Sequence, residues 1–320
     1  MKSKIVGTLL LCIYFCVSQF NPALAKEEKP KIPKGLKTKT ELKYKFVEKS
    51  GEYKKALHQK DIYRYDDRGN EIESASYGAA GKLTDKWLYK YDARGNKIER
   101  DGYGADGKLL AKYLYKYDDQ GNRIEDAQYA ADGMLLYKNL SKYDDKGNEI
   151  EWAQYAADGM LLRKNLAKYD DKGNQIESAE CYSDGKIVDK YLSKYDDKGN
   201  QIESASYGAD GKLEGNGFSK YDAKGNRIEE AQYGADGKLL IKYLAKYDDQ
   251  GNQIEDAQYG ADGKLFIKYL TKYDDQGNET EITEYKIGGE KSGKIQEIPT
   301  SQTAWEYEFY TAKDKPADGK

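Results

Sequence analysis

Adjacent aspartates recur along the chain, as at Asp170-Asp171, and are the first candidates for chemistry. Paired carboxylates could hold calcium or act as a general acid and a general base. Their spacing differs from that of an EF-hand, whose oxygen ligands alternate through a loop that ends in glutamate. Acid–base catalysis needs carboxylates in unlike, partly buried surroundings, whereas these pairs recur in one repeated turn. We expect no cofactor, and weak calcium binding at the Asp-rich turns is the alternative.

Histidine and cysteine offer little for nucleophilic catalysis. Histidine occurs once, at His58, and we interpret it as a surface residue. A Ser-His-Asp or Cys-His catalytic arrangement would have to use this one histidine. Cys12 and Cys16 lie in the N-terminal apolar stretch, and the third cysteine is Cys181. Cys181 takes a place that is tyrosine in other units, so we interpret it as a small semi-buried replacement. A reactive or intermolecularly paired thiol is the alternative. The sequence predicts no catalytic residue.

Tyrosine, which occurs 31 times, has the spacing best suited to ligand binding. Regularly spaced amphipathic rings can stack on sugars or peptides at modest entropic cost. The candidate binding column is Tyr77, Tyr103, Tyr129, Tyr155, Tyr207, Tyr233, Tyr259 and Tyr285. A second column includes Trp87, Tyr113, Tyr191, Tyr243 and Tyr269. The alternative is that these rings stack on one another as the packing of the protein itself.

These residues recur because the chain is a repeat array. Nine Tyr-Asp pairs, from Tyr65 to Tyr273, follow one another at a spacing of 26 residues. Each unit carries two turn signals, a Tyr-Asp-x-x-Gly-Asn element such as 117–122 and an Ala-Asp-Gly-Lys element such as 235–238. Glycine accepts the positive φ of such turns, and Asp or Asn bonds to its own backbone. Two turns per unit predict two strands per unit.

The segments between turns are typical of strands, because roughly 8 to 10 residues suit a strand and are short for a stable helix. In 239–247, leucine, isoleucine, tyrosine and alanine on one face alternate with leucine and lysine on the other. Short connections make neighbouring strands antiparallel. We predict an all-β fold of tandem antiparallel β-hairpins with a 26-residue unit, forming an elongated, twisted or superhelical β-meander. Open and wound sheets fit the pattern alike.

Charged residues and glycines add two local predictions. Glu229 or Glu255 in the first strand of a unit and Lys246 or Lys272 in the second predict cross-strand charge pairs. One unit departs from the pattern and predicts an irregular, kinked strand, since glycines inside a strand usually mark a bulge, a bend or a close backbone approach. A binding site there is the minority hypothesis. The residues of this irregular strand are Gly215, Gly217 and Phe218.

The ends of the chain predict export. Lys2 and Lys4 precede an apolar stretch at 5–17, and Ala23-Leu24-Ala25 forms an A-x-A cleavage site, which together are typical of a signal peptide. A membrane anchor is the alternative. The expected organisation is a signal peptide at 1–25, a flexible lysine-rich lead segment at 26–40, a degenerate N-terminal capping hairpin at 41–64, the hairpin array at 65–289, a C-terminal capping strand region at 290–312 and a disordered tail at 313–320.

Composition excludes some partners. Charged residues make up 34% of the chain, and the mean hydropathy is −0.97, but the tyrosines argue against disorder. The formal net charge is −3, and the repeat units are acidic, so a phosphate backbone would meet more repulsion than attraction. We expect no nucleic acid partner and no membrane span after signal removal. The oligomeric state is not predicted.

The Tyr-Asp-x-x-Gly-Asn element, as in 91–96, resembles the YD repeats of the RHS and teneurin-like family over roughly 65–289. The resemblance implies β-hairpins that can spiral into a shell, on exported or surface proteins often associated with carbohydrate binding or with packaging a toxin segment. The Tyr-Gly-Ala-Asp-Gly-Lys element at 233–238 is similar, more weakly, to MORN-type hairpin repeats, which implies the same array.

Three hypotheses for function follow. The first is an exported, non-enzymatic β-repeat scaffold that acts as a binding, display or structural module in the periplasm, at the cell surface or outside the cell. The second is a carbohydrate- or cell-wall-binding protein that uses the tyrosine column. The third is an enzyme of unknown class. The partners expected are an extended polysaccharide or a surface protein, bound through many weak contacts.

Overall fold

The computed structural model describes residues 33–291 and 294–311, and within these ranges the chain is a single antiparallel sheet without helices. The first strands are β1 (Leu36–Lys49), β2 (Glu52–Tyr65), β3 (Glu71–Gly78), β4 (Leu83–Tyr91), β5 (Lys97–Gly104), β6 (Leu109–Tyr117), β7 (Arg123–Ala130), β8 (Leu135–Tyr143), β9 (Glu149–Ala156) and β10 (Leu161–Tyr169). They are followed by β11 (Gln175–Tyr182), β12 (Ile187–Tyr195), β13 (Gln201–Gly208), β14 (Leu213–Tyr221), β15 (Arg227–Gly234), β16 (Leu239–Tyr247), β17 (Gln253–Gly260), β18 (Leu265–Tyr273), β19 (Glu279–Lys291) and β20 (Lys294–Phe309).

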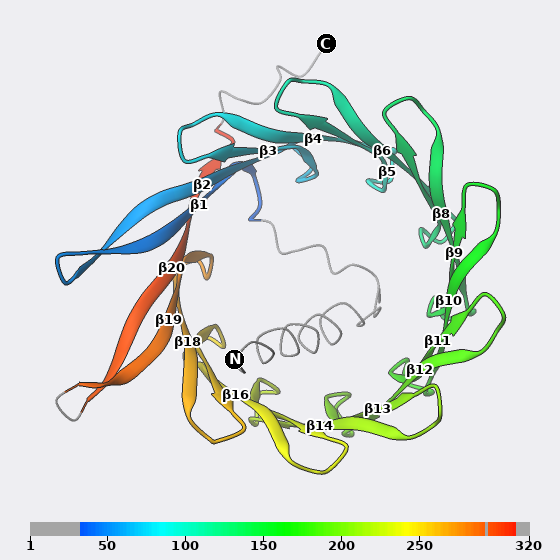
Figure 1. Ribbon diagram of the computed structural model, residues 1–320. Coiled ribbons are helices and arrows are strands. Elements are labelled where there is room, and N and C mark those ends of the chain that lie inside the picture. Colours follow the sequence, from blue (N-terminus) through cyan, green and yellow to red (C-terminus); the bar gives the residue numbers. More distant parts are fainter. Residues whose placement is uncertain (1–32, 292–293, 312–320) are drawn as a thin grey trace, which may run out of the picture.

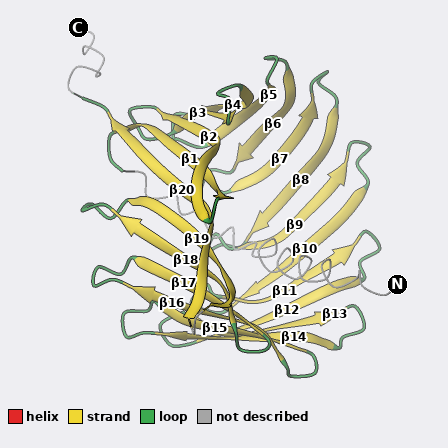
Figure 2. Cartoon of the chain, turned by 60° about the vertical axis from the view of Figure 1, so that its left-hand side comes forward, coloured by secondary structure: helices red, strands yellow, loops and turns green. Residues whose placement is uncertain are grey.

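Each strand pairs with its neighbour in sequence, which confirms the predicted meander of antiparallel hairpins. The sheet also closes, because β20 pairs with β1, with Glu306 opposite Thr40. Figure 1 looks along the resulting barrel and shows the strands as a ring in chain order, and Figure 2 shows the strands tilted around it. The long meander is therefore wound into a barrel whose first and last strands are partners.

The expected boundaries change at the two ends. β1 begins at Leu36, inside the segment 26–40 that was expected to be flexible, and Leu36 is 2% exposed. The region 290–312 was expected to cap an open edge, but β20 instead joins β19 to β1. The predicted signal peptide at 1–25 and tail at 313–320 lie outside the described residues. None of the described residues forms a helix long and apolar enough to cross a membrane.

Both predicted turns are present in the repeat units. In the Tyr-Asp-x-x-Gly-Asn turn, Gly121 has a φ of 86°, and Asp118 N–H donates to the Asn122 carbonyl at 2.9 Å. The Asp118 carboxylate accepts the N–H groups of Gln120 and Asn122 at 3.0 and 2.8 Å, and it also accepts the Asn122 side-chain amide at 2.9 Å. The aspartate and asparagine of this turn are therefore used to fix its backbone.

This geometry predicts different effects for two adjacent aspartates. Asp118→Ala removes the acceptor of both backbone N–H groups and is expected to lower Tm by roughly 2–4 °C. Asp119→Ala is the matched control, because Asp119 is exposed and its side chain has no hydrogen bond within the described residues. Calorimetric melting of the two variants checks the prediction. Equal melting temperatures would contradict the role assigned to Asp118.

The two faces of the sheet are electrostatically different. On one face, Lys112 and Lys90 bind Glu99 and lower its pKa to about 2. On the other face, burial raises the pKa of Asp126, Glu180 and Asp256. The inner wall of a closed barrel faces the opposite wall, whereas the outer face meets solvent, so we assign the second face to the interior.

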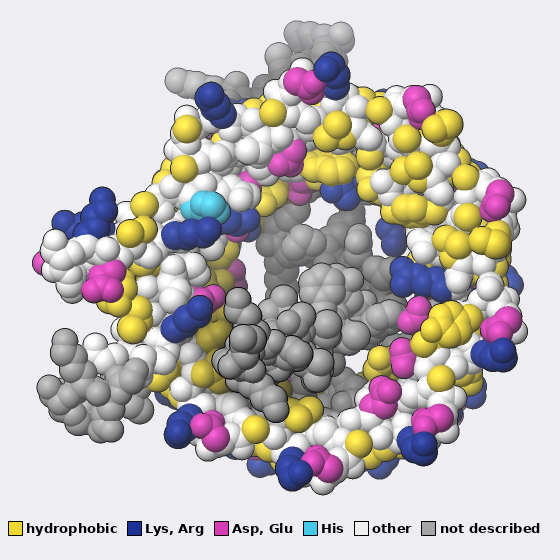
Figure 3. All heavy atoms as spheres, viewed as in Figure 1, with side chains coloured by type: hydrophobic (Ala, Val, Ile, Leu, Met, Phe, Trp, Pro, Cys, Tyr) yellow, Lys and Arg dark blue, Asp and Glu magenta, His cyan; other side chains and the backbone are white. Residues whose placement is uncertain are grey.

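Regular ion pairs cover the outer face, as predicted. Lys246 binds Glu255 at 2.9 Å, and Lys272 binds Glu281 at 2.7 Å. Glu229 lies between Lys220 and Lys242, at 3.1 and 3.3 Å. Such exposed pairs contribute to register and solubility more than to stability. Figure 3 shows charged side chains of both signs around the margin of the barrel.

Candidate binding surface on the inner wall

The proposed tyrosine column lies on the outer face. Tyr129 is opposite Lys112 and Tyr259 is opposite Lys242, in the same rows as the ion pairs. All eight tyrosines of the column are half-buried. Cys181, which takes the corresponding position between Tyr155 and Tyr207, is buried and forms no disulfide within the described residues. His58 is exposed on β2, as expected. The outer column is therefore a regular surface that looks much the same from unit to unit.

The inner wall, by contrast, changes from unit to unit. One inner row consists of Ser74, Arg100, Asp126, Trp152, Ser178, Ser204, Glu230 and Asp256. The row paired with it consists of Trp87, Tyr113, Asn139, Asn165, Tyr191, Gly217, Tyr243 and Tyr269. Residues that the barrel itself requires should recur in every unit, since every unit has the same backbone. The varied inner residues are therefore not needed to build the barrel, and they give the inner wall a specific chemistry at each position.

An arginine between two aromatic rings marks one part of this wall. The guanidinium carbon of Arg100 lies 3.7 Å from the centroid of the Trp87 ring and 5.4 Å from that of Tyr113. A Cβ added at Gly102 would lie 2.5 Å from the Trp87 ring, so glycine at this position leaves space for the indole to lie on the strand. Cation–π contacts of this kind hold a guanidinium by its face. Its hydrogen-bonding edge remains for another group.

A buried polar cluster lies on the next strands of the inner wall. Asn139 donates its side-chain amide to Asp126 at 2.7 Å, and Asn139 and Glu149 are each 8% exposed. Burial raises the pKa of Glu149 to about 7, with Asp126 adding to the shift and Arg123 opposing it. Among the described residues, Asn139 Oδ1 and Glu149 Oε2 have no hydrogen-bond partner. Unpaired buried acceptors are costly unless another molecule supplies a donor.

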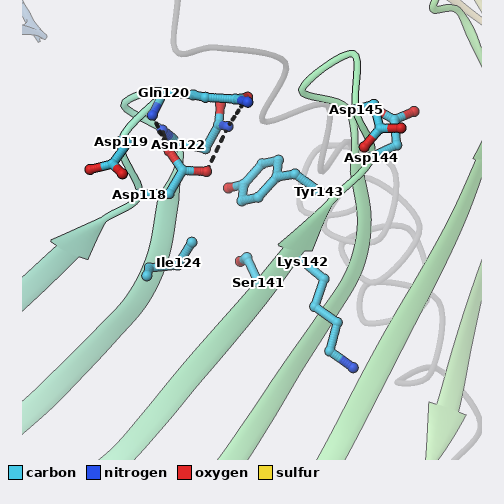
Figure 4. A pocket seen from close by; sticks show the side chains of 10 residues that line it. All are labelled: Asp118, Asp119, Gln120, Asn122, Ile124, Ser141, Lys142, Tyr143, Asp144 and Asp145. Atoms are coloured by element: carbon cyan, nitrogen blue, oxygen red, sulfur yellow. Dashed lines mark hydrogen bonds between the residues drawn. The ribbon is translucent and has the colours of Figure 1, made fainter.

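A pocket of about 360 Å³ lies at one rim of the barrel, between two successive Tyr-Asp-x-x-Gly-Asn turns. Figure 4 shows Asp118 and Asp144, from two successive turns, on either side of the Tyr143 ring, with Ile124 and Ser141 below them. Ser141 and Tyr143 are also among the groups that interact with the Glu149 carboxyl. The pocket therefore borders the buried cluster. No metal-binding cluster of histidine, cysteine and carboxylate side chains occurs in the part of the chain that is described.

The strand that was expected to be irregular and kinked is continuous. β14 runs unbroken through Gly215 and Gly217, and its register shifts fall at the same positions as in neighbouring units. Both backbone ladders continue because glycine retains its N–H and carbonyl groups. A close backbone approach is present, since a Cβ added at Gly215 would lie 2.8 Å from the Tyr233 carbonyl oxygen. At Gly215 and Gly217 no side chain projects from the inner wall. Phe218 is 44% exposed on the outer face, with its ring edge-on to Tyr233 at 5.9 Å.

Sequence reasoning missed Arg100, Asn139 and Glu149, although it placed Trp87 and Tyr113 in one column. A signal was present in the sequence. Comparing the units position by position separates residues that recur in every unit from residues that vary. The varying positions alternate with the recurring ones along each strand, and the structure shows that the varying set lines the interior.

No protein-family model matches the chain, and no curated protein matches it. Similar solved structures include a TcdB2-TccC3 complex, at 17% identity and a TM-score of 0.32 over 83% of this chain and 16% of that one. A porin-like protein from Bacteroides uniformis is 14% identical, with a TM-score of 0.36, over 84% of this chain and 97% of that one. The chain thus spans 16% of the length of the first of these structures. Similarities this low carry no argument about function.

Proposed function

We propose that the protein is an exported, non-enzymatic binding module, in which the outer face builds the barrel and the inner wall binds the ligand. The observation that supports this most is the difference between the two faces within one chain. Outer glutamates and lysines recur in every complete unit and pair with one another, as Lys246 does with Glu255. Inner residues vary and include buried polar atoms without partners among the described residues.

The family and location proposed here rest on the sequence. The Tyr-Asp-x-x-Gly-Asn turns support a place among proteins with YD-type hairpin repeats, as a short closed barrel. The basic start, apolar stretch and Ala23-Leu24-Ala25 site support export to the periplasm, the cell surface or the exterior. Outer lysines are paired with glutamates and the inner wall carries both signs of charge, which argues against a nucleic acid ligand. An extended polysaccharide or a surface protein is the partner that we propose.

The second candidate is carbohydrate binding by the outer tyrosine column. Its support is the regular row of half-buried rings beside lysines, such as Tyr129 beside Lys112. Such a row suits a long, repetitive ligand that gains affinity from many weak contacts. The inner and outer hypotheses make opposite predictions for two matched sets of variants.

Binding to a panel of bacterial polysaccharides and purified surface proteins tests the proposal. The guanidinium carbon of Arg163 lies 5.1 Å from the centroid of the inner Trp152 ring. Replacing Trp152 and Arg163 with alanine is expected to weaken binding by at least about tenfold, while serine at outer Tyr129 and Tyr155 leaves it unchanged. The converse result would support the tyrosine column instead. A folded chain that binds nothing in the panel would contradict both. Catalytic turnover abolished by Glu149→Gln would contradict the non-enzymatic part.

A further inference from the structure

We propose, building on the binding function above, that the inner wall from β4 to β9 binds an acidic oligosaccharide. Arg100 binds a carboxylate of the sugar chain, and Asn139 and Glu149 accept hydrogen bonds from its hydroxyl groups. Trp87 and Tyr113 position the arginine and are not themselves the sugar platform.

The first support is the way in which Arg100 is held. One ring lies 3.7 Å from its guanidinium carbon and the second lies 5.4 Å away, so the aromatic contacts use the faces of the group. Its Nε is buried without a hydrogen-bond partner, and no ion pair of Arg100 occurs within the described residues. A guanidinium held by its faces presents a planar edge that matches a carboxylate through two parallel hydrogen bonds.

Unused acceptors on neighbouring strands give independent support. Asn139 and Glu149 are each 8% exposed, and each has one side-chain oxygen without a donor among the described residues. The other end of Asn139 is fixed, because its amide donates to Asp126. The orientation of Asn139 Oδ1 is therefore fixed. Because no described residue donates a hydrogen bond to this oxygen, the donor must come from a ligand. Hydroxyl groups supply such donors without adding charge.

The combination of charges selects among ligand classes. A polymer with a phosphate at every step would also meet the carboxyl groups of Asp126 on β7 and Glu149 on β9, and it would bring no donors for their oxygens. A neutral sugar would leave the Arg100 edge without its best partner. Uronic-acid chains carry a carboxylate on each uronate residue together with free hydroxyl groups, so they supply both the anion and the hydrogen-bond donors. Three strand spacings separate β5 from β8, roughly 14 Å, so an oligosaccharide reaches both groups and a single sugar does not.

Calorimetric titration of the full chain tests the inference with defined probes. These are oligosaccharides of galacturonate, mannuronate and hyaluronan, a neutral galactose oligosaccharide, and inorganic phosphate. We expect at least one uronate probe to bind, and we expect the neutral probe and phosphate to bind at least about tenfold more weakly. Failure of every uronate probe overturns the inference. Phosphate that binds as tightly as a uronate probe shows a bare anion site and overturns the assignment to a sugar.

Matched variants locate the binding. Arg100→Gln is expected to weaken uronate binding at least about tenfold, and Arg100→Lys by less, because lysine retains the charge and loses the planar edge. Lys112→Gln is the control, since Lys112 pairs with Glu99 on the outer face of the next strand. Asn139→Leu should weaken the uronate probe and leave the thermal unfolding cooperative. Unchanged binding in Arg100→Gln overturns the inference. The general binding function survives that outcome if the inner Trp152 and Arg163 variants lose another ligand.

Discussion

A chain truncated after Lys291 is expected to lose the closed barrel. β20 joins the two ends of the sheet, with Glu306 opposite Thr40 on β1 and Ala304 opposite Glu281 on β19. Cross-strand pairs contribute about 0.2–1 kcal/mol each, so losing both ladders should lower the free energy of unfolding by on the order of 5 kcal/mol or more. The truncation also exposes two long strand edges, which favour association between chains.

Two measurements check this prediction, namely urea unfolding and the particle size in solution. The matched control is a chain truncated after Thr311, which retains β20 and also Tyr310, whose hydroxyl donates to the Tyr65 carbonyl at 2.7 Å. The control should unfold like the full chain, and the shorter chain should be less stable and prone to aggregate. If the two truncated chains unfolded alike, β20 would not be the closing strand.

Glu149→Gln is expected to stabilise the protein at alkaline pH, by on the order of 3 kcal/mol at pH 8. Burial raises the pKa of Glu149 from its usual 4.5 to about 7. Below pH 4.5 the carboxyl is protonated in both the folded and the unfolded state. As pH rises from 4.5 to 7, the unfolded state loses its proton first, so the folded state becomes less stable. Glutamine cannot ionise and therefore removes this loss.

Glu151, on the same strand, is a control for which the opposite effect on stability is expected, because its pKa is shifted in the opposite direction. Burial acts to raise its pKa, but Lys164 and Lys142 together lower it below its usual value. A carboxyl group whose pKa is lowered by folding stabilises the folded state at pH values above its pKa in the unfolded state. This contribution is lost as the pH falls. Glu151→Gln should therefore destabilise the protein at neutral pH. Thermal melts of both variants from pH 4 to 9 make the comparison, and a Glu149→Gln profile parallel to that of the full-length parent would contradict the buried setting of Glu149.

The local parts of the fold could be predicted from sequence because each has a local cause. Asp118, Gly121 and Asn122 form a turn by bonding within a few residues, and this turn recurs at a fixed spacing. Closure could not be predicted, because it depends on the small twist and curvature of every hairpin adding up to a full circle. The partners that close the ring, such as Thr40 and Glu306, are far apart in sequence and lie outside the regular units.

The candidate site was only partly accessible to sequence reasoning. Period-two alternation places Trp87 and Tyr113 on one face and Tyr103 and Tyr129 on the other. Alternation alone does not tell which face lies inside, because both faces contain aromatic, charged and aliphatic residues. The tyrosine column was therefore chosen for its regularity. Regularity within a repeat protein instead indicates residues required by the architecture, and Arg100 was overlooked because it occurs in one unit only.

The distance between Arg64 on β2 and Lys272 on β18 tests the closed barrel most directly. Spin labels at these two positions, in a chain whose three cysteines are replaced by serine, allow that distance to be measured by pulsed electron paramagnetic resonance. In the closed barrel, four strand spacings across the β1–β20 pair separate the labels, about 20–30 Å. In an open ribbon the path from β2 to β18 crosses every strand between them, on the order of 75 Å. A single short distance is the predicted result, and a distribution centred far above 40 Å would contradict closure.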